Sequence, residues 1–488
     1  MVPSSDPYQK QRIDCVQALH QSPTQLVAAL SGGGTLLLGD LLTVPGGSRT
    51  LIEAAVPYSY ESISNYIGRV PEQFCCSRTA RTLAMTAFYH AQQILRSEAL
   101  RKRGYVDIER VSPRNVDVSH EFEDITESAV IRSTNFVQPI DMEEFGAFKH
   151  VMGIGCTASL VTNRQKEGEH RIHVAVQTLQ QTVQFSLLLQ KDSRTRLEEE
   201  RLVADLILNA IETARQGIGT HTPPPSLTDT ESKVAISPAL IESSSNDYPL
   251  HEHIPLQLKP GEIVRGECAA ASPLLVDLFF GKLGAVLWTK GGIRHAIASE
   301  DIAASVHPYN QCAQYTQAIF PGSFSPIHKG HLEMINIAEQ RLQEKVVLEI
   351  SIQNVDKPPF DYIELEHRLA QIDEAKPGQA VWLTQTPLFV SKAELFQGTT
   401  FVVGADTIKR FADLRFYYEN VHKLHDILRT IAFCNCRFLV FARESKTGLE
   451  SMDTLNVPDM LRSLCDDVSP SVFTMDISSS DIRREETQ

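Results

Sequence analysis

The segment Ala318–His331 reads AIFPGSFSPIHKGH and is the most informative part of this chain. An apolar run typical of a buried strand covers residues 317–320, and a loop of Gly, Ser and Pro follows it. Beyond the loop, apolar residues recur every three or four positions, at Leu332, Ile335, Ala338 and Leu342. That spacing predicts a helix, so His328 and His331 lie where a loop enters a helix. Free N–H groups and the helix dipole favour a phosphate at such a place.

The residues His328–His331 form the pattern His-x-Gly-His, in which Gly330 keeps a side chain out of the space between the two imidazoles. With 16 His and 26 Gly in 488 residues, this pattern arises by chance roughly three times in a hundred such chains. A helix-capping pair or part of a metal site is the alternative interpretation. The Gly- and Pro-rich lead-in and the strand–loop–helix context favour a phosphate site.

The segment resembles the HxGH signature of the nucleotidylyltransferase superfamily, whose usual form is close to GGSFxPxHxGH. The similarity extends from about Gln317 to the end of the chain, and three further blocks keep the family order. These blocks are residues 354–358 (NVDKP), 401–407 (FVVGADT) and 477–483 (ISSSDIR). The second block resembles the GAD strand end of nicotinate and nicotinamide mononucleotide adenylyltransferases, and the third resembles their closing ISSTxIR motif.

Further strands are predicted at Val346–Ser351, Val381–Thr384, Thr400–Val403, Arg437–Phe441 and Phe473–Ile477, with a helix near Ile363–Glu374. Short β-branched strands that alternate with helices indicate an α/β fold in which a parallel sheet carries helices on both faces. The resemblance implies that this sheet is Rossmann-like. Ligands of such sheets bind at the carboxyl ends of the strands, near the point where strand order reverses. Because each of the four motifs follows a predicted strand, we expect them to converge on one cleft.

The reaction that the resemblance implies is transfer of a nucleotidyl group from a nucleoside triphosphate to a phosphate on a second substrate, with release of pyrophosphate. Such a reaction requires two anions held in line and neutralisation of the charge on the reacting phosphate. We expect His328 and His331 to donate hydrogen bonds to the triphosphate, and the phosphate to favour their protonated forms. Further phosphate contacts are expected from Lys357, Arg443, Ser479, Ser480 and Arg483.

The remaining predicted nucleotide-binding residues are Gly322, Ser323, Phe324, Gly404 and Asp406. Gly322 and Ser323 would let the backbone approach the nucleotide. Asp406 would accept from a ribose hydroxyl or help to position magnesium.

Structural alternatives exist for several of these residues. Asp406 is also a suitable cap for a helix predicted at Thr407–Leu414, and Ser478–Ser480 suits the start of a terminal helix. The structural alternative for Lys357 is an ordinary solvated lysine. For Arg443 it is an ion pair with a surface carboxylate.

The resemblance favours a pyridine mononucleotide as the acceptor. The Gly-Ala-Asp-Thr and Ile-Ser-Ser-Ser blocks suit that branch, and the Arg-x-x-Gly-Ile-Ser-Thr ending of the lipid-headgroup cytidylyltransferases is missing. The pyridine family often has a tryptophan after the GAD strand, whereas this chain has aromatic residues at Phe411, Phe416, Tyr417 and Tyr418. An aromatic ring there could stack on a pyridine, and core packing explains these residues equally well.

Composition excludes several classes of protein. A hydrophobic content of 42% with 22% charged residues is typical of globular domains, and 488 residues suit two or three of them. The net charge of −14 argues against a nucleic-acid partner. No apolar run reaches transmembrane length and residues 1–11 are polar, so neither a membrane partner nor a signal peptide is predicted. The 9 cysteines lack zinc or disulfide spacing, which favours reduced thiols and a cytoplasmic location.

Residues 1–216 carry a second resemblance. An apolar run at Leu26–Leu30 precedes SGGGT, and VPGGS and VPYS follow at 44–48 and 56–59. These strings resemble the CinA C-terminal domain family, which includes nicotinamide mononucleotide deamidases. The resemblance places Ser31 at the family's nucleophile. The family's lysine base would fall at position 63, which here holds Ile63.

A serine hydroxyl needs a base to act as a nucleophile, and an isoleucine cannot take a proton. We therefore expect an α/β domain that keeps this fold for binding or assembly; an amidohydrolase with a replacement base is the alternative. The family's later glycine-rich block is also altered here, at Gly153–Ala158.

The domain prediction is completed by a linker at 217–260, a connecting segment at 261–314 and the nucleotidylyltransferase domain at 315–488. The linker is rich in Pro and Ser. The connecting segment contains an expected hairpin at Ala285–Thr289 and Ile293–Ala296.

The sequence as a whole predicts an adenylyltransferase that uses ATP with Mg²⁺ to convert a pyridine mononucleotide into a dinucleotide, a step of NAD biosynthesis. The partners are ATP and a phosphorylated small molecule; a homo-oligomer is compatible with the sequence. One alternative is a cytidylyl- or adenylyltransferase for another phosphorylated acceptor. The other is a nucleotide-binding sensor without turnover.

Overall fold

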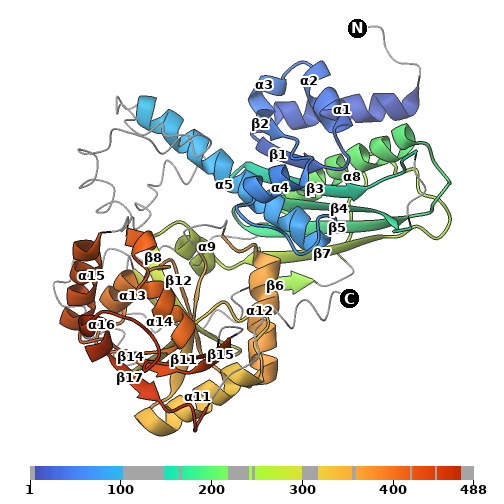
Figure 1. Cartoon of the computed structure of the whole chain (residues 1–488). Coiled ribbons are helices and arrows are strands. Elements are labelled where there is room, and N and C mark those ends of the chain that lie inside the picture. The colour runs from blue at the N-terminus through green and yellow to red at the C-terminus, as the bar shows by residue number, and fades with distance from the viewer. Residues whose placement is uncertain are drawn as a thin grey trace.

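The computed structural model describes residues 6–102, 148–163, 167–217, 241–244, 248–298, 317–353, 359–417, 420–445 and 448–473. The chain forms two α/β units, each built on its own large sheet (Figure 1). The first unit holds the N-terminal residues and the second holds the residues from 273 onward.

The first unit has a seven-stranded sheet of order β2-β1-β3-β4-β5-β7-β6. Its strands are β1 (Gln25–Ser31), β2 (Leu51–Ala55), β3 (Val151–Ser159), β4 (His170–Gln177), β5 (Gln181–Leu189), β6 (Ile241–Ser244) and β7 (Val264–Ala271). The strands β2, β1 and β3 are parallel, and the pairs from β3 through β6 are antiparallel.

Helices cover both faces of this sheet. They are α1 (Pro7–Gln21), α2 (Leu36–Thr43), α3 (Gly47–Thr50), α4 (Tyr60–Tyr66), α5 (Ser77–Lys102) and α8 (Arg196–Gly217). Side chains of β1 alternate between the two cores, because successive residues of a strand point to opposite faces. Leu26 and Ala28 pack with α1, α2 and α8, whereas Val27 and Ala29 pack with α4 and α5.

The altered glycine block has a packing function in this unit. A Cβ at Gly153 would lie 2.1 Å from the Ala84 carbonyl oxygen, and a Cβ at Gly155 would lie 2.0 Å from that of Ala80. Helix α5 therefore lies directly on strand β3, at a distance that only glycine permits.

Part of the segment predicted as a linker is packed on the first unit. Ile254 is fully buried, and its backbone N–H and C=O both bond to the side chain of Asn209 in α8. The connecting segment 261–314 divides between the units: β7 joins the first sheet, whereas β8 (Leu283–Thr289) and β9 (Gly292–Ala298) join the second. The residues predicted as a hairpin are these two antiparallel strands.

The second unit has an eight-stranded sheet of order β17-β14-β13-β10-β11-β12-β8-β9. The other strands are β10 (Ala318–Pro321), β11 (Val346–Ser351), β12 (Val381–Thr384), β13 (Thr400–Gly404), β14 (Arg437–Phe441) and β17 (Cys465–Val468). These six are parallel, and β8 adds antiparallel to β12. A separate ribbon pairs β15 (Arg443–Ser445) with β16 (Gly448–Glu450).

The helices of this unit are α9 (Pro273–Phe279), α11 (Lys329–Leu342), α12 (Tyr362–Ala375), α13 (Phe389–Leu395), α14 (Ala405–Phe411), α15 (Val421–Phe433) and α16 (Asp459–Ser463), with a 3₁₀ turn η1 (Leu414–Tyr417). Residues of α11 and α12 pack with Phe320 and Leu348 on one face of the sheet. Residues of α13, α14 and α15 pack with Ile319 and Val347 on the other. The predicted α/β fold with helices on both faces of a parallel sheet is therefore confirmed.

The last parallel strand is Cys465–Val468, before the position predicted for it. Of the predicted strand Phe473–Ile477, Phe473 is a buried residue outside any strand, and residues 474–477 lie outside the described residues. Strand order reverses at β10: the chain continues from β10 to β11 and β12 on one side, and then returns to β13, β14 and β17 on the other side.

The two units meet where α5 and β5 face α12. The Arg81 guanidinium contacts the Asp361 carboxylate at 3.1 Å, and both side chains are buried. The Tyr362 N–H donates to the Thr182 hydroxyl (3.0 Å), and the Tyr362 hydroxyl donates to the Leu179 carbonyl (2.7 Å). A buried polar contact of this kind fixes the orientation of its partners, because breaking it would leave unsatisfied groups. Among the described helices, none has the length and apolar content needed to cross a membrane.

Candidate active site

The two histidines of the HxGH pattern lie at the start of α11, next to the point where strand order reverses. His328 is the N-cap residue, with extended backbone, and its N–H donates to Nδ1 of His331 at 3.2 Å. The two rings stack, with centroids 3.7 Å apart and planes inclined by 27°. Buried Gly330 lies between them in sequence and leaves room for this contact.

Phe324 holds the His331 ring in place. It adopts a positive φ of 43° in the loop, is buried, and meets the His331 ring edge-on at a centroid distance of 5.2 Å. Its ring also covers Gly322, where an added Cβ would lie 2.7 Å from the ring. Gly322 is thus needed to accommodate Phe324, and Phe324 acts as a support beneath the histidines rather than as an open surface for a ligand.

Both imidazoles are neutral at pH 7 in this structure. Burial and the neighbouring His328 lower the pKa of His331 to about 3. Burial and the positive charge of Arg443 lower the pKa of His328. Since Nδ1 of His331 accepts a hydrogen bond, the proton of its neutral ring is on Nε2. Nδ1 of His328 is buried and has no hydrogen-bond partner among the described residues.

Asp406 and Arg443 are brought together from two neighbouring strand ends. Asp406 lies in the first turn of α14 after β13, and its Oδ2 is 3.2 Å from Nη1 of Arg443 in β15. The N-cap of α14 is Gly404, so Asp406 does not cap this helix. An added Cβ at Gly404 would lie 2.6 Å from the Asp406 carboxylate, which explains the glycine. The strands β10, β13 and β14 are parallel neighbours, so the residues that follow their carboxyl ends lie at the same edge of the sheet as the histidines.

The structure brings some predicted residues together and leaves others undescribed. His328, His331, Asp406 and Arg443 gather at the carboxyl end of the sheet. Lys357, Ser479, Ser480 and Arg483 lie outside the described residues. Of the predicted aromatic residues, Phe411 packs with Phe389 and Phe438, and Tyr417 donates its hydroxyl to the Phe411 carbonyl. These two side chains belong to the core.

Arg368 was not predicted and supports the loop that precedes the histidines. Its guanidinium donates to the Ser323 carbonyl and to Glu364 (2.7 Å), and it lies over the ring of Phe360 at 4.1 Å. The signal available in the sequence was an arginine on the apolar face of a helix, four residues after a glutamate. Ser323 itself is exposed in the loop.

In the first unit, the predicted nucleophile Ser31 ends β1 and is buried. Gly32, which follows it, has a φ of 75° and allows no side chain, because an added Cβ would lie 1.9 Å from the Ala158 carbonyl oxygen. Ile63 is buried among apolar residues of α5 and β1. The position that holds a base in the resembling family therefore belongs to the core here.

A cavity of about 400 Å³ lies beside Gly32 and Gly33. Glu200 in this cavity accepts from the backbone N–H and hydroxyl of Thr35 through one carboxylate oxygen. Its other carboxylate oxygen has no hydrogen-bond partner among the described residues and lies 3.7 Å from Nη2 of Arg196.

Comparison with protein families matches residues 319–485 to the cytidylyltransferase-like family. The match begins at β10 and extends over the parallel strands of the second unit. The C-terminal part of the chain is thus similar to the cytidylyltransferase-like family and has a Rossmann-like fold, and the match supports nucleotidyl transfer in general. A search of curated proteins found no match to this chain.

Proposed function

We propose that the second unit is an adenylyltransferase that transfers AMP from ATP to nicotinamide or nicotinic acid mononucleotide and releases pyrophosphate, a reaction of NAD biosynthesis. The observation that carries the proposal is the stacked pair His328 and His331 at a helix entrance, beside Arg443 and at the reversal of strand order. Two imidazoles, a guanidinium and a helix N-terminus at one place suit a triphosphate.

The histidines would act through hydrogen bonds and charge. In the free protein, His331 presents Nε2–H as a donor, because its Nδ1 is held by the His328 backbone. A bound phosphate would oppose the desolvation that keeps the rings neutral and would favour a second proton on the pair. The pair would then stabilise the negative charge on the oxygens around the reacting phosphorus.

Mg²⁺ would enter this site with ATP. Among the described residues, no group of three or more His, Cys, Asp or Glu side chains could hold a metal ion. Magnesium is commonly held by substrate phosphates with few protein ligands, and it supplies charge neutralisation of the triphosphate when bound. Asp406, which contacts Arg443, is a carboxylate at this site that could help to position such a complex.

A pyrophosphate-release assay tests the proposal. The full chain is mixed with Mg²⁺ and either ATP or CTP, and each pyridine mononucleotide is added in turn. Release that requires ATP and a pyridine mononucleotide supports the proposal. Release only with CTP, or only with another phosphorylated acceptor, would assign a different substrate. No release with any acceptor, combined with measurable ATP binding, would indicate a sensor.

For the first unit, we infer that a CinA C-terminal-like fold is kept for binding or assembly without deamidation. Ile63 provides no base for Ser31, and the altered glycine block packs against α5. Incubation with nicotinamide mononucleotide should release no ammonia above that of the Ser31→Ala variant. Ammonia release that depends on Ser31 would show an active amidohydrolase with a different base.

A further inference from the structure

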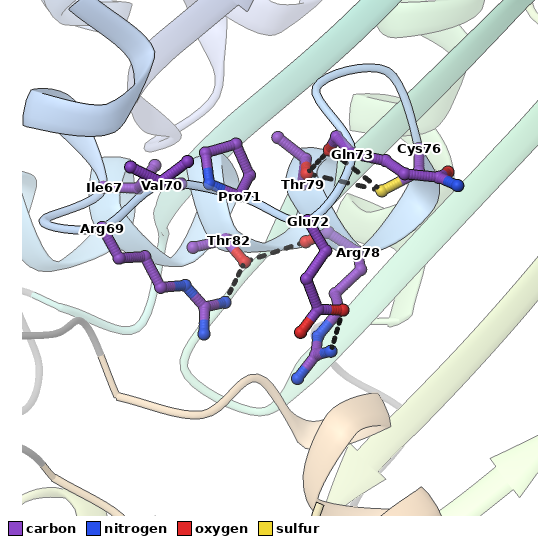
Figure 2. Close-up of a pocket in the computed structure, with 10 residues that line it drawn as sticks. All are labelled: Ile67, Arg69, Val70, Pro71, Glu72, Gln73, Cys76, Arg78, Thr79 and Thr82. Carbon is purple, nitrogen blue, oxygen red and sulfur yellow. Dashed lines mark hydrogen bonds and ion pairs between the residues drawn. The ribbon is translucent and has the colours of Figure 1, made fainter. Parts of the chain in front are cut away.

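A cavity lies between the two units, beside the loop that leads to the histidines. Its volume is about 140 Å³, enough for several water molecules or an oxyanion. Its polar lining comprises Arg69, Glu72, Arg78, Thr82, Ser323, Ser325, Ser351, Asp361, Glu364 and Arg368. A second cavity of about 170 Å³ continues it into the first unit and shares Arg69, Glu72, Arg78 and Thr82 (Figure 2).

The cavity lies at the same sheet edge as the candidate triphosphate site. Ser323 and Ser325 belong to the loop between β10 and His328, and Ser351 ends the adjacent strand β11. In an in-line displacement, the attacking oxygen of the acceptor and the leaving pyrophosphate lie on opposite sides of the reacting phosphorus. The second anionic substrate therefore needs a site adjacent to the triphosphate. The position of this cavity meets that requirement.

Positive charge exceeds negative charge around the cavity. The lining itself holds three guanidinium groups and three carboxylates. The buried guanidinium of Arg81, which lies behind the lining and pairs with Asp361, adds a fourth positive charge to the cluster. The nearby carboxylate of Glu267 is already paired with His367 at 2.8 Å. An additional anion would therefore balance the charge of the cluster.

The excess charge is located on Arg69. Arg81 pairs with Asp361, and Arg368 pairs with Glu364. Arg69 has no ion pair among the described residues: its guanidinium donates to the Thr82 hydroxyl at 3.3 Å, and its Nε is buried without a partner. Burial and the neighbouring Arg78 lower the pKa of Arg69, and the more distant carboxylates of Glu364, Glu72 and Asp361 oppose this shift only in part.

Arg78 lies beside Arg69 and contacts residues of the second unit. Its guanidinium contacts Glu364 of α12 at 3.0 Å and the Ser325 hydroxyl at 3.5 Å. Figure 2 shows the Arg78 guanidinium paired with Glu72 and the Arg69 guanidinium bonded to Thr82, both extending toward the lower part of the view. Guanidinium groups form charge-assisted hydrogen bonds with phosphate and often bind it through two N–H groups at once, and serine hydroxyls add further donors.

We propose that Arg69 and Arg78 bind the phosphate group of the mononucleotide acceptor in this cavity, so that the first unit completes the acceptor site of the second. This inference rests on the proposed function. It also gives the first unit a role that needs neither Ser31 nor a base at position 63.

The kinetic test compares Arg69→Ala with the unchanged full chain. Loss of a charge-assisted contact should lower kcat/KM for the mononucleotide by about tenfold to hundredfold, while KM for ATP changes by less than about twofold. Arg69→Lys keeps the charge without the planar donor set. Its kcat/KM for the mononucleotide should lie between the values of Arg69→Ala and the unchanged chain. The matched control is Arg101→Ala, which removes the same charge from an exposed position of α5 and should behave like the unchanged chain.

A binding test separates this inference from the proposed function. Calorimetry with nicotinamide mononucleotide and, separately, with inorganic phosphate needs no turnover. Loss of mononucleotide binding in Arg69→Ala supports the site even if the unchanged chain shows no transfer. If only inorganic phosphate binding is lost, the cavity holds a free anion and the assignment to the acceptor is wrong. Equal affinities in both proteins, or a kinetic effect on ATP alone, would overturn the proposal.

A folding control is available because Arg69 makes a single side-chain hydrogen bond to a hydroxyl. If it served only to hold the structure, Arg69→Ala would melt at a lower temperature without ligand. We expect no decrease, since the variant removes a half-buried charge that has no ion pair among the described residues. In the unchanged chain, inorganic phosphate or mononucleotide should raise the melting temperature, and this increase should be lost in Arg69→Ala.

Discussion

The imidazole rings of His328 and His331 stack with their centroids 3.7 Å apart, and the backbone of the first residue donates to the ring of the second. Two positive charges at this separation repel each other strongly, so the pair resists protonation until an anion is present. The arrangement couples the charge state of the pair to the presence of a phosphate.

Replacing His331 tests its part in the transferase reaction. The His331→Ala variant should lower turnover by about a hundredfold or more, because a donor to the reacting phosphate is lost. His422→Ala is the control, since His422 is exposed on α15. Turnover is measured by pyrophosphate release, and an unchanged rate in His331→Ala would remove this residue from the mechanism.

Triphosphate affinity should depend on pH through the same pair. The pKa values of both rings are lowered in the free protein, whereas a bound triphosphate would raise them, so binding takes up protons. Affinity should therefore increase as pH falls from 8 to 6, approaching about tenfold per pH unit for each proton taken up. Titration with inorganic triphosphate measures this directly. The slope should be smaller in His331→Asn, and an affinity independent of pH would exclude proton uptake.

Acid should destabilise the free protein through His331. Its folded pKa, about 3, lies below the unfolded value, so the unfolded chain binds the proton first. The stability from neutral His331 is present above pH 6.5 and is lost as pH falls toward 3, by about 1.4 kcal/mol per pH unit.

The variant His331→Asn isolates this contribution, because its side-chain oxygen can still accept from the His328 backbone. Denaturant unfolding at pH 7 and pH 5 should show a smaller loss of stability in the variant. Equal losses in the two proteins would mean that His331 ionises normally.

A buried ion pair in the second unit provides a test of stability away from the site. The Lys392 ammonium lies 2.6 Å from the Glu349 carboxylate, and both side chains are almost fully buried. Lys392→Met should lower the free energy of unfolding by about 3–5 kcal/mol, because it leaves a buried carboxylate unpaired. The double variant Lys392→Met, Glu349→Leu should recover most of this loss. Denaturant unfolding checks both; a double variant no more stable than the single one would contradict the explanation.

The fold of the second unit could be predicted well where strands are short, apolar and bounded by turns. The predicted bounds of β11, β12 and β14 agree with the structure. Strand β17 was missed because its sequence, Cys-Asp-Asp-Val, contains two aspartates at the edge of the sheet and lacks a strand pattern. Edge positions tolerate such charges.

The site could be predicted only in part. His328 and Asp406 belong to motifs and Arg443 is a predicted phosphate contact outside them, and the structure places the three at one edge of the sheet. Arg69 and Arg78 could not be found in this way. Arg78 reaches Glu364, 286 positions further along the chain, and no local pattern reveals a contact between two units. Local patterns also do not reveal that part of the predicted linker packs on the first unit. This packing depends on the hydrogen bond from the Ile254 backbone N–H to the side chain of Asn209.

The path of the chain through β8 and β9 determines how the transferase unit can be isolated. A fragment that starts at residue 315 would lack the strand that pairs with β12, and the backbone of Val381–Thr384 would become an open edge. The indole of Trp382, now fully buried, would lose part of its cover from Ala285 and Leu287. Such a fragment should self-associate through that edge, and a transferase fragment for crystallisation or screening needs to begin before Leu283.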